Sequence, residues 1–263
     1  PMEEDKEWNY ENRFAAAKVG NDNAAYMAKD QWTANFNLNR EPRYYASLGF
    51  DRGIWMGQGT KDVSKSNYLK ARAGEPAANA FETSWCMSGI WPKKLVHDET
   101  VLTKTNITYQ KYPFPIMRMA NLYLLYAEAL NEIKAPYTEV LPWIDKVRER
   151  AGLEGVETAW TNHSTDPEKF KDQTGLREII HQERLIELSL EGQRYWDIRR
   201  WKQIDTYNIQ PQGWNIMGET PEDFYKLQNV AEVPVKVTVK DYFMPIRETN
   251  IITNKNLVQN YGW

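Results

Sequence analysis

GLREIIHQERLIELSLEGQRYWDIRRWK, which spans residues 175–202, is the stretch that decides the fold. Its apolar residues recur at the three- and four-residue steps of an amphipathic helix, so we predict a helix over 175–191. Gly192 can end this helix by adopting a left-handed conformation. A second short helix, with aromatic residues along one side, is predicted over 194–203.

Charged residues follow the same helical spacing. Arg184 lies three residues before Glu187 and seven before Glu191, so these side chains can share one helix face. Arg194 and Asp197 continue the series. Paired carboxylates can perform acid and base catalysis. Here arginines alternate with the carboxylates on a strongly apolar helix, which favours a structural network of ion pairs that fixes the angle between two helices.

This charged pattern resembles the ER-x-x-EL-x-x-EG-x-R-x-x-D-x-x-RW motif of the SusD/RagB family, whose members are nutrient-binding lipoproteins on the surface of Gram-negative bacteria. The match runs from residue 183 through residue 201. Three more segments resemble motifs of this family. They are N-R-[DE]-P-R at 39–43, P-[IL]-[IM]-R-x-A-x-x-Y-L-x-Y-A-E-A-x-N at 115–131, and the closing P-I-P-x-x-E-x-x-x-N-x-x-L-x-Q-N-x-G-[YW] motif within 242–263.

The resemblance implies a mainly α fold, built from tetratricopeptide-like helix pairs with long loops and a few short strands. It also implies a non-catalytic protein at the outer membrane that faces outward, binds an oligosaccharide, and caps a SusC-like TonB-dependent transporter. Some relatives bind a peptide instead. The motifs belong to the scaffold, so Arg40, Arg43 and Glu128 are assigned to the same structural network as the charged residues of 183–197.

The ends of the chain carry their own expectations. The chain opens at Pro1 and contains neither a signal peptide nor a lipid-accepting N-terminal cysteine, so we expect the C-terminal part of a longer, lipid-anchored protein. Because the closing motif reaches Trp263, we expect this residue to be the natural C-terminus.

Composition excludes several classes of protein. The chain carries 33 Lys and Arg against 36 Asp and Glu, a net charge of −3, so a nucleic-acid partner is not expected. No apolar run approaches membrane-spanning length.

Cys86 is the one cysteine, which forbids an internal disulfide, and its apolar neighbours indicate an inert buried thiol. The three histidines are isolated and build no zinc site. No cofactor is expected, although Asp- and Asn-rich loops leave a structural calcium ion open.

The whole chain, residues 1–263, is expected to form one SusD/RagB-type domain in four parts. These are an irregular aromatic-rich segment at 1–38, strands and loops at 39–111, helical pairs at 112–203, and a C-terminal loop and strand region at 204–263.

Several elements within these parts are predicted individually. We expect a short helix over 22–32, a strand over 44–50 whose entry Pro42 stiffens, its hairpin partner at 54–56, an exposed excursion over 57–80, and a loop at 97–111. Helices are expected over 116–133 and 139–151, with Pro142 in the first turn of the second and Gly152 closing it. A polar loop is expected over 153–173 and a strand over 233–239.

Candidate ligand-binding residues come from side-chain chemistry alone. Aromatic residues make up 13% of the chain, including 11 Trp, and rigid amphipathic rings suit the faces of sugars. Those in irregular stretches are the candidates: Trp8, Tyr10, Trp32, Trp55, Trp85 and Trp91. Asn37 and Asn39 are added as hydrogen-bonding groups. The helical Trp143, Trp196 and Trp201 are assigned to packing.

Two other functions stay open at this stage. A glycan-cleaving enzyme could use Glu183 and Glu187, which are spaced for a carboxylate pair on one helix. The neighbouring arginines, however, would keep both ionised and leave no general acid. A scaffold that binds only proteins is the other alternative, and direct binding of a soluble ligand would distinguish it from a glycan-binding protein.

Overall fold

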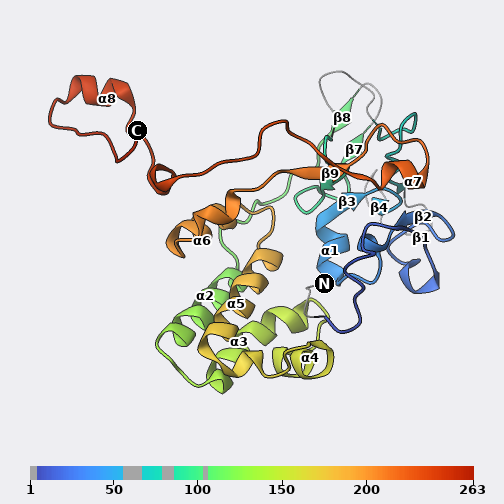
Figure 1. The fold of residues 1–263 in the computed structure, drawn as a ribbon, viewed down its shortest axis with the longest axis horizontal. Helices are drawn as coiled ribbons and strands as arrows, with labels where there is room; N and C mark the ends of the chain where they lie inside the picture. Colours follow the sequence, from blue (N-terminus) through green and yellow to red (C-terminus); the bar gives the residue numbers. More distant parts are fainter. Residues whose placement is uncertain (1–4, 56–66, 79–85, 103–105) are drawn as a thin grey trace.

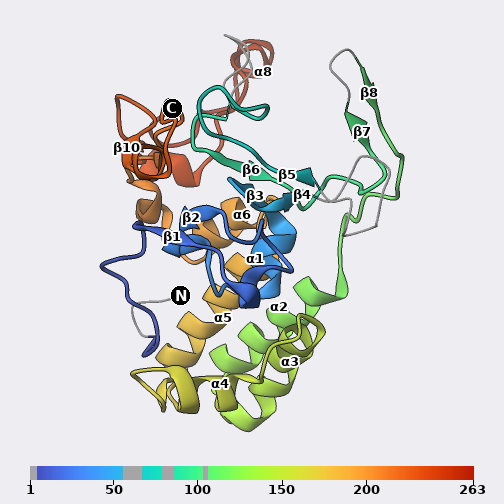
Figure 2. The ribbon, with the colours of Figure 1, turned by 90° about the vertical axis from the view of Figure 1, so that its right-hand side faces the viewer.

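The computed structural model describes residues 5–55, 67–78, 86–102 and 106–263. A layer of helices lies at the bottom of Figure 1, a region of short paired strands lies at the right, and a C-terminal arm extends away from both. The turned view in Figure 2 places α1 between the helical layer and the strand region. Helices dominate and the strands are short, which confirms the predicted fold class.

The helices are α1 (Pro42–Ser47), α2 (Met119–Glu132), α3 (Tyr137–Arg150), α4 (Val156–His163), α5 (Gln173–Glu187), α6 (Gln193–Arg200), α7 (Pro221–Phe224) and α8 (Glu248–Thr253). Short 3-10 helices are η1 (Asn21–Asn23), η2 (Asn35–Asn37), η4 (Lys169–Lys171), η5 (Ile204–Tyr207) and η6 (Val239–Tyr242). The strands form antiparallel pairs: β1 (Ala16–Lys18) with β2 (Trp32–Ala34), β3 (Leu48–Phe50) with β6 (Ile90–Pro92), β4 (Ile54–Trp55) with β5 (Asn67–Tyr68), β7 (Val101–Leu102) with β8 (Ile107–Thr108), and β9 (Gln212–Trp214) with β10 (Leu227–Asn229).

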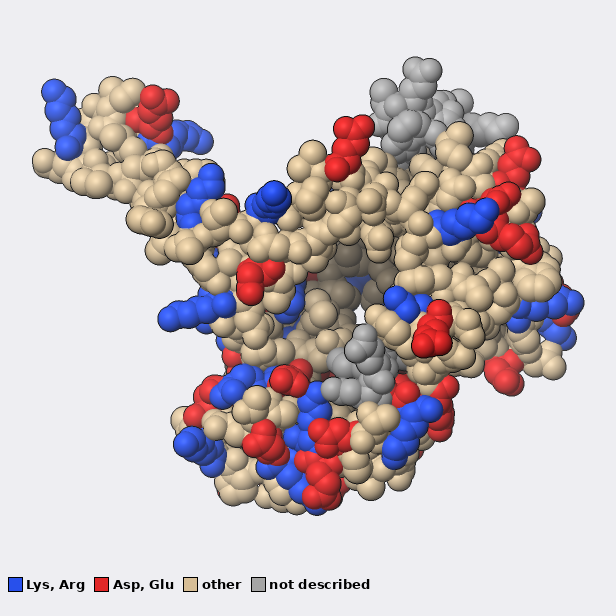
Figure 3. Space-filling view, viewed as in Figure 1, with Lys and Arg blue, Asp and Glu red and all other residues tan. Residues whose placement is uncertain are grey.

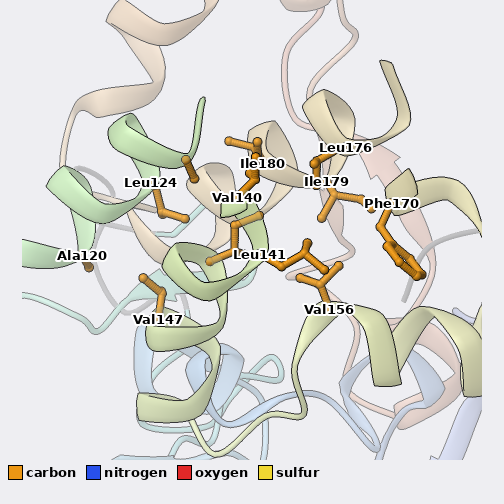
Figure 4. Packing of buried hydrophobic residues seen from close by; sticks show 12 residues of the cluster. Ala120, Leu124, Val140, Leu141, Val147, Val156, Phe170, Leu176, Ile179 and Ile180 are labelled. Carbon is orange, nitrogen blue, oxygen red and sulfur yellow. The ribbon is translucent and has the colours of Figure 1, made fainter. Parts of the chain in front are cut away.

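The main hydrophobic core lies where α2, α3 and α5 meet, with α4 closing one side (Figure 4). Leu124, Val140, Ile144, Val156 and Ile180 are fully buried in it. Their three- and four-residue spacing on each helix directs them to one side, and each such aliphatic side chain contributes roughly 1.5–3 kcal/mol when buried. The core therefore holds α5, with its charged residues, in a fixed position.

The predicted end of the helix over 175–191 is wrong. The helix begins after Asp172, whose carboxylate accepts hydrogen bonds from the Thr174 and Gly175 amides at 2.9 and 3.0 Å. It ends at residue 187, because the following turn contains two left-handed residues, Leu190 (φ 64°) and Gly192 (φ 79°). Gly192 precedes α6 and does not end α5.

The helical layer departs from prediction in two further places. The predicted polar loop over 153–173 contains α4 and η4, because Val156 and Phe170 are buried in the core despite their polar surroundings. Pro142 lies in the second turn of α3, because that helix begins before the expected residue. Gly152 closes α3 in a left-handed conformation (φ 74°), as predicted.

In the region before the helices, the strand predicted over 44–50 is wrong in its first half. Pro42 occupies the first helical position of α1, where its missing N–H costs nothing, and only the last three residues are extended. The hairpin with 54–56 is also wrong, since β3 pairs with β6 and β4 pairs with β5. Met56 lies outside the described residues.

Four other predictions fail through pairing or burial. The helix over 22–32 reduces to η1, because Met27 pairs with Gly53 in a β-bridge and residue 32 belongs to β2. The loop at 97–111 contains the β7–β8 pair. In the described part of the 57–80 excursion, Ala71 and Arg72 are buried, and Arg72 Nε donates to Asp51 Oδ2 at 3.0 Å. The strand over 233–239 does not form, and Val233 is 72% exposed.

The C-terminal arm is stabilised by contacts within itself. The Gln259 side chain accepts from the Ile246 amide at 2.8 Å and donates to the Ile246 carbonyl at 2.9 Å. Trp263 Nε1 donates to the carbonyls of Lys240 and Phe243 at 3.0 and 3.1 Å. These bonds close the chain around α8 into the loop that projects at the left of Figure 1.

Gly175→Ala is expected to destabilise the protein. On an isolated helix this change stabilises by about 1 kcal/mol. Here a Cβ atom would overlap the backbone carbonyl oxygen of Lys169, which cannot rotate away, so we expect a net loss of about 1–3 kcal/mol. Urea denaturation measures it. Gly20→Ala, where a Cβ meets no atom within 4 Å, is the control and should change stability by less than about 0.5 kcal/mol. An unchanged midpoint for Gly175→Ala would contradict this contact.

Candidate functional site

Charged side chains from several parts of the chain meet along α5. Glu187 is the centre of this junction and is 2% exposed. Its carboxylate accepts from Arg118 Nη1 at 2.7 Å, from Arg150 Nη2 at 2.8 and 2.9 Å, and from Arg43 Nη1 at 3.2 Å. These arginines come from the residue before α2, the end of α3 and α1. The junction therefore joins α1, α2, α3 and α5.

The carboxylates on either side of Glu187 are paired as well. Glu183, 3% exposed, accepts from Arg43 Nη1 and from Arg148 Nη1. Glu191 accepts from Arg118 Nη2 at 2.7 Å and lies 2.6 Å from Lys94 Nζ. Each carboxylate of the junction thus has at least two cationic partners.

The electrostatics of the junction argue against acid catalysis. Burial alone would raise the pKa of Glu187, but the hydrogen bonds and charge of Arg118 and the charge of Arg150 outweigh it and lower this pKa. The pKa of Glu191 is lowered in the same way by Arg118 and Lys94, against its burial. A glycan-cleaving enzyme needs one carboxylic acid that keeps its proton. No observation in the junction supports that role.

A second group of ion pairs joins α5 to α6. Arg184, 2% exposed, donates from Nε and Nη2 to the two carboxylate oxygens of Asp197 at 3.0 and 2.9 Å. Its remaining Nη1 donates to Asn121 Oδ1 at 3.0 Å. The partner of Arg184 is therefore on the next helix, and not Glu187 or Glu191 as the spacing along α5 suggested.

The outer side of this group is formed by Glu128 and Arg200. The Glu128 carboxylate accepts from Arg200 Nη2 at 2.6 Å and from Trp201 Nε1 at 2.7 Å. Arg194, which the sequence predicts in the network, makes no ion pair within the described part of the chain, and its guanidinium carbon lies 5.9 Å from the centre of a Trp201 ring. Arg200 holds the position that the sequence assigned to Arg194.

His181 is expected to make the free energy of unfolding fall in mild acid, because it is protonated more readily in the unfolded chain than in the fold. Its ring stacks on Trp201 at a centroid distance of 3.4 Å. Burial lowers the pKa of His181 to about 4, with the charge of Glu128 opposing. The unfolded chain takes up this proton near pH 6.5, so stability falls as pH drops from about 6.5 to 4, by about 2 kcal/mol after allowance for partial exposure.

Two measurements check the role of His181. Nuclear magnetic resonance should give a ring pKa near 4. His181→Phe keeps an aromatic ring against Trp201 and should remove this part of the pH dependence of unfolding. A measured pKa above 6 in the native protein would contradict the effect of burial.

The candidate ligand-binding aromatics divide into exposed and packed residues. Tyr10 is 40% exposed and Trp32 is 44% exposed. The guanidinium of Arg13 lies 3.6 Å from the centre of the Tyr10 ring, which fixes the plane of that ring. Trp8 is half-buried and lines a cleft beside α1. These three aromatics all lie in the segment before α1.

Trp55 and Trp91 are brought together around Gly49. A Cβ atom at Gly49 would lie 2.5 Å from Trp55 Cζ3 and 3.4 Å from Trp91 Cβ. Both rings are half-buried, and Trp91 packs against the cluster around Trp214. This contact explains why residue 49 has no side chain.

The remaining candidates have different outcomes. Asn37 is fully buried, its amide donates to Thr33 Oγ1 at 3.0 Å, and its side-chain oxygen accepts from Tyr44 Oη at 2.7 Å, so it is withdrawn as a ligand-binding residue. The side-chain oxygen of Asn39 accepts from Asn23 Nδ2 at 2.8 Å. Trp85 lies outside the described residues.

The assignment of all three helical tryptophans to packing is wrong for one of them. Trp143 packs against the main core and Trp201 stacks on His181. Trp196 on α6 is 57% exposed. The sequence pattern of α6 could not show that Trp196 is exposed, because the helix has more apolar residues than its buried side holds.

Residues outside the predicted network complete the junction. Arg118, Arg150 and Lys94 are distant from α5 in sequence, and spacing along one helix gives no signal for them. Arg118 could have been found, because it is the arginine of the predicted motif at 115–131.

The described residues include no group of three or more His, Cys, Asp or Glu side chains that could hold a metal ion. Within the same residues, no helix is both long and apolar enough to cross a membrane. Figure 3 shows Lys and Arg interspersed with Asp and Glu over the helical layer, without a large patch of one sign, and a hollow where that layer meets the strand region.

Comparison with known proteins places this chain in a family. Residues 3–263 match the model of the SusD family. The SusD-like protein P2 of Formosa agariphila is 31% identical over 144 residues, which cover 55% of this chain and 24% of that protein. The SusD-like protein P25 of the same organism is 40% identical over 86 residues, 33% of this chain and 15% of that protein.

Solved structures agree. The structure of selenomethionine BT4246 superimposes with a TM-score of 0.77 at 25% identity, covering 98% of this chain and 42% of that one. A SusD-like protein from Bacteroides fragilis, BF3747, has a TM-score of 0.63 and shares the fold at 24% identity, covering 88% of this chain and 40% of that one. The chain thus spans about a quarter of the curated relative P2 and about two-fifths of these solved structures. With a family match that runs from residue 3 to residue 263, this protein belongs to the SusD family.

Proposed function

We propose that this protein captures glycans at the cell surface, without catalysis, for import through a SusC-like TonB-dependent transporter. The SusD family is one of non-catalytic binding proteins. The observation that carries the proposal is that the carboxylates which could perform catalysis are buried and paired, whereas aromatic side chains which could bind a sugar are exposed. Glu183, Glu187 and Glu191 are held in ion pairs, whereas Tyr10 and Trp32 are exposed in the segment before α1.

The location follows from the same family membership. We place the full-length protein at the outer membrane, lipid-anchored and facing outward, as the SusD family suggests. The SusC-like transporter is the proposed protein partner. A peptide ligand is the alternative that a binding experiment must distinguish from a glycan.

Calorimetry with soluble plant, host and microbial glycans tests the function, using both this chain and a longer version with its upstream region. Binding without release of reducing sugar is the expected result. Binding of peptides and of no glycan would replace the proposal with its alternative. If the wild type released reducing sugar and the Glu187→Gln variant did not, the non-catalytic assignment would be overturned.

Trp32→Ala is expected to weaken binding of such a glycan about 5- to 30-fold, because one exposed aromatic anchor contributes about 1–2 kcal/mol. Trp196→Ala is the matched control, since this tryptophan is also exposed but lies on α6 in the helical layer. Equal affinities of wild type and Trp32→Ala, measured by the same calorimetry, would remove Trp32 from the site.

A further inference from the structure

α2 is apolar on both of its sides. Its inner side, which includes Leu124 and Ala127, packs against α3 and α5 in the main core. Its outer side consists of exposed apolar residues: Met119, Leu122, Leu125, Tyr126, Ala129 and, directly after the helix, Ile133. A helix at a protein surface normally places charged and polar residues on its outer side, whereas a helix that is apolar all round is normally buried. The outer side of α2 therefore has the composition of a buried surface.

The charges of α2 and of its neighbour α3 show how unusual this side is. The charged residues of α2 are Glu128 and Glu132, and they pair with Arg200 of α6 and Arg177 of α5. By contrast, the exposed residues of α3 include Glu139, Lys146, Glu149 and Arg150. α3 thus has an ordinary solvent-facing side, whereas the charges of α2 are all engaged with its own helical layer.

The outer residues of α2 are spaced for contact with another helix. Steps of three, four, three and four residues separate Met119, Leu122, Tyr126, Ala129 and Ile133. This is the spacing of the a and d positions of a heptad, which form a line of contact against a neighbouring helix. Ala129 is small, so it allows a second helix axis to approach to the usual distance of about 8–10 Å. The surface therefore fits an α-helix that has an apolar side of its own.

The C-terminal arm, residues 239–263, is a second apolar surface. None of its residues is buried, and its exposed side chains include Phe243, Met244, Ile252 and Tyr261. In Figure 1 the arm extends to the left above α6, on the side of the helical layer where α2 lies. Its helix α8 has six residues, far fewer than the about 12–15 that an isolated helix needs in water. The arm therefore needs another surface to pack against.

The size of a solved relative indicates what covers these two surfaces. The superposition of BT4246 covers 98% of this chain, so it includes α2 and nearly all of the arm, but it accounts for 42% of BT4246. More than half of that protein therefore lies outside the part that this chain matches. To form one folded body with the matched part, a polypeptide of that length needs an apolar surface on it. In this protein, the outer side of α2 and the arm provide such a surface.

We propose that the outer side of α2 packs against an amphipathic α-helix of the same polypeptide, which the full-length protein has in addition to these 263 residues, and that the arm packs against the same additional part. A second copy of this chain and the proposed transporter are the other occupants that a test must exclude. The inference concerns the architecture of the full-length protein and does not depend on its ligand, so it stands or falls separately from glycan capture.

Oxidation of methionines by hydrogen peroxide, read out by mass spectrometry, tests the proposal in the purified full-length protein. Met119 is 56% exposed and Met244 is 53% exposed in the present structure. Met217 is 66% exposed and precedes α7, at the opposite side of Figure 1 from α2, so it is the internal control. Because oxidation follows exposure, we expect Met119 and Met244 to react about 10-fold more slowly than Met217 in the full-length protein. In the 263-residue chain the three should react at similar rates.

The other outcomes of this experiment identify a different occupant. Met27 is fully buried, so its slow oxidation shows that the protein stays folded during the reaction. Equal rates for Met119 and Met217 in the folded full-length protein would overturn the proposal and leave the outer side of α2 open to the transporter. Protection of Met119 that disappears on dilution, together with a dimeric mass by light scattering, would assign this side to a second copy and overturn the proposal as well.

Leu122→Asp gives an independent test, because an unpaired carboxylate buried in a contact between helices is strongly destabilising. In the full-length protein we expect this change to lower the Tm by about 4 °C or more. Met217→Asp places the same charge at an exposed apolar position away from α2 and is the matched control, with an expected change below about 1 °C. In the 263-residue chain, where Leu122 is 50% exposed, the two variants should have similar Tm values. An unchanged Tm for Leu122→Asp in the full-length protein would overturn the proposal.

Discussion

Glu187→Gln is expected to lower the free energy of unfolding by about 3–5 kcal/mol. The wild-type carboxylate is buried among Arg43, Arg118 and Arg150 and bonded to all three. The amide keeps the shape, but it removes the negative charge and replaces one acceptor with a donor. Arg43 would keep Glu41 and Glu183, and Arg118 would keep Glu191, but both would face an amide N–H where the buried anion was, and that loss of a buried anion is strongly destabilising. Arg150 is 59% exposed, so water can replace its bond.

Urea denaturation at pH 7 measures this change. Glu178→Gln on the same helix is the control, because its carboxylate is 61% exposed in its pair with Lys169 and should change stability by less than about 1 kcal/mol. A loss below 1 kcal/mol for Glu187→Gln would show that water screens the junction.

The pH dependence of stability gives an independent check on Glu187. Because its pKa is lowered in the fold, it contributes stability above its ordinary value near 4.5, and that contribution is lost as pH falls through the lowered pKa. The wild type should therefore lose stability below about pH 4.5 more steeply than Glu187→Gln. Parallel curves for the two proteins would contradict the lowered pKa.

The helical layer could be read from the sequence because its cause is local. Leu124 and Ile180 lie on apolar stripes that repeat every three or four residues, and such a stripe identifies its own helix. The helix ends were less predictable, because they depend on single residues such as Leu190, whose left-handed backbone no pattern announces. Val156 shows the same limit, since one buried valine holds a helix within an otherwise polar segment.

The strand region could not be read in the same way, because its strands depend on distant partners. Leu48–Phe50 pairs with a strand about forty residues later, and no signal in either segment names the other. The alternation of Val233, Val235 and Val239 suits a strand, yet no strand among the described residues pairs with them. An alternating pattern predicts which residues of a strand would face the same side, but it does not predict which other strand would pair with it.

The charged junction lies between these two cases. The spacing of Arg184 and Glu187 pointed to a charged face on α5, but Glu191 lies beyond the end of this helix and the partners come from four other parts of the chain. The candidate site is less predictable still. Asn37 looked like a free polar group and is fully buried, whereas Trp160, assigned no role in the sequence, has a buried Nε1–H without an acceptor among the described residues.

Asp197→Asn is expected to cost about 3–5 kcal/mol and to loosen α6 from α5. Asp197 is 4% exposed and accepts both bonds of the Arg184 fork, so the amide would leave a buried guanidinium without an anion. Arg200 would lose its bond to the same carboxylate, but it keeps Glu128 and is partly exposed. The larger part of the cost therefore arises at Arg184.

The double variant Arg184→Met/Asp197→Leu distinguishes the net contribution of the ion pair to the free energy of unfolding from the loss that follows when only one partner is removed. Replacing both members of a buried ion pair by apolar residues is often neutral or stabilising, so we expect the double variant to be more stable than Asp197→Asn by about 2 kcal/mol or more. Asn121 would lose the hydrogen bond from Arg184 Nη1, which lowers the stability of the double variant by about 1 kcal/mol. The exposed pair Arg177–Glu132, which also joins two helices, is the control, and breaking it should cost less than about 1 kcal/mol. If the double variant were less stable than Asp197→Asn, the ion pair itself, and not its desolvation, would hold α6 in place.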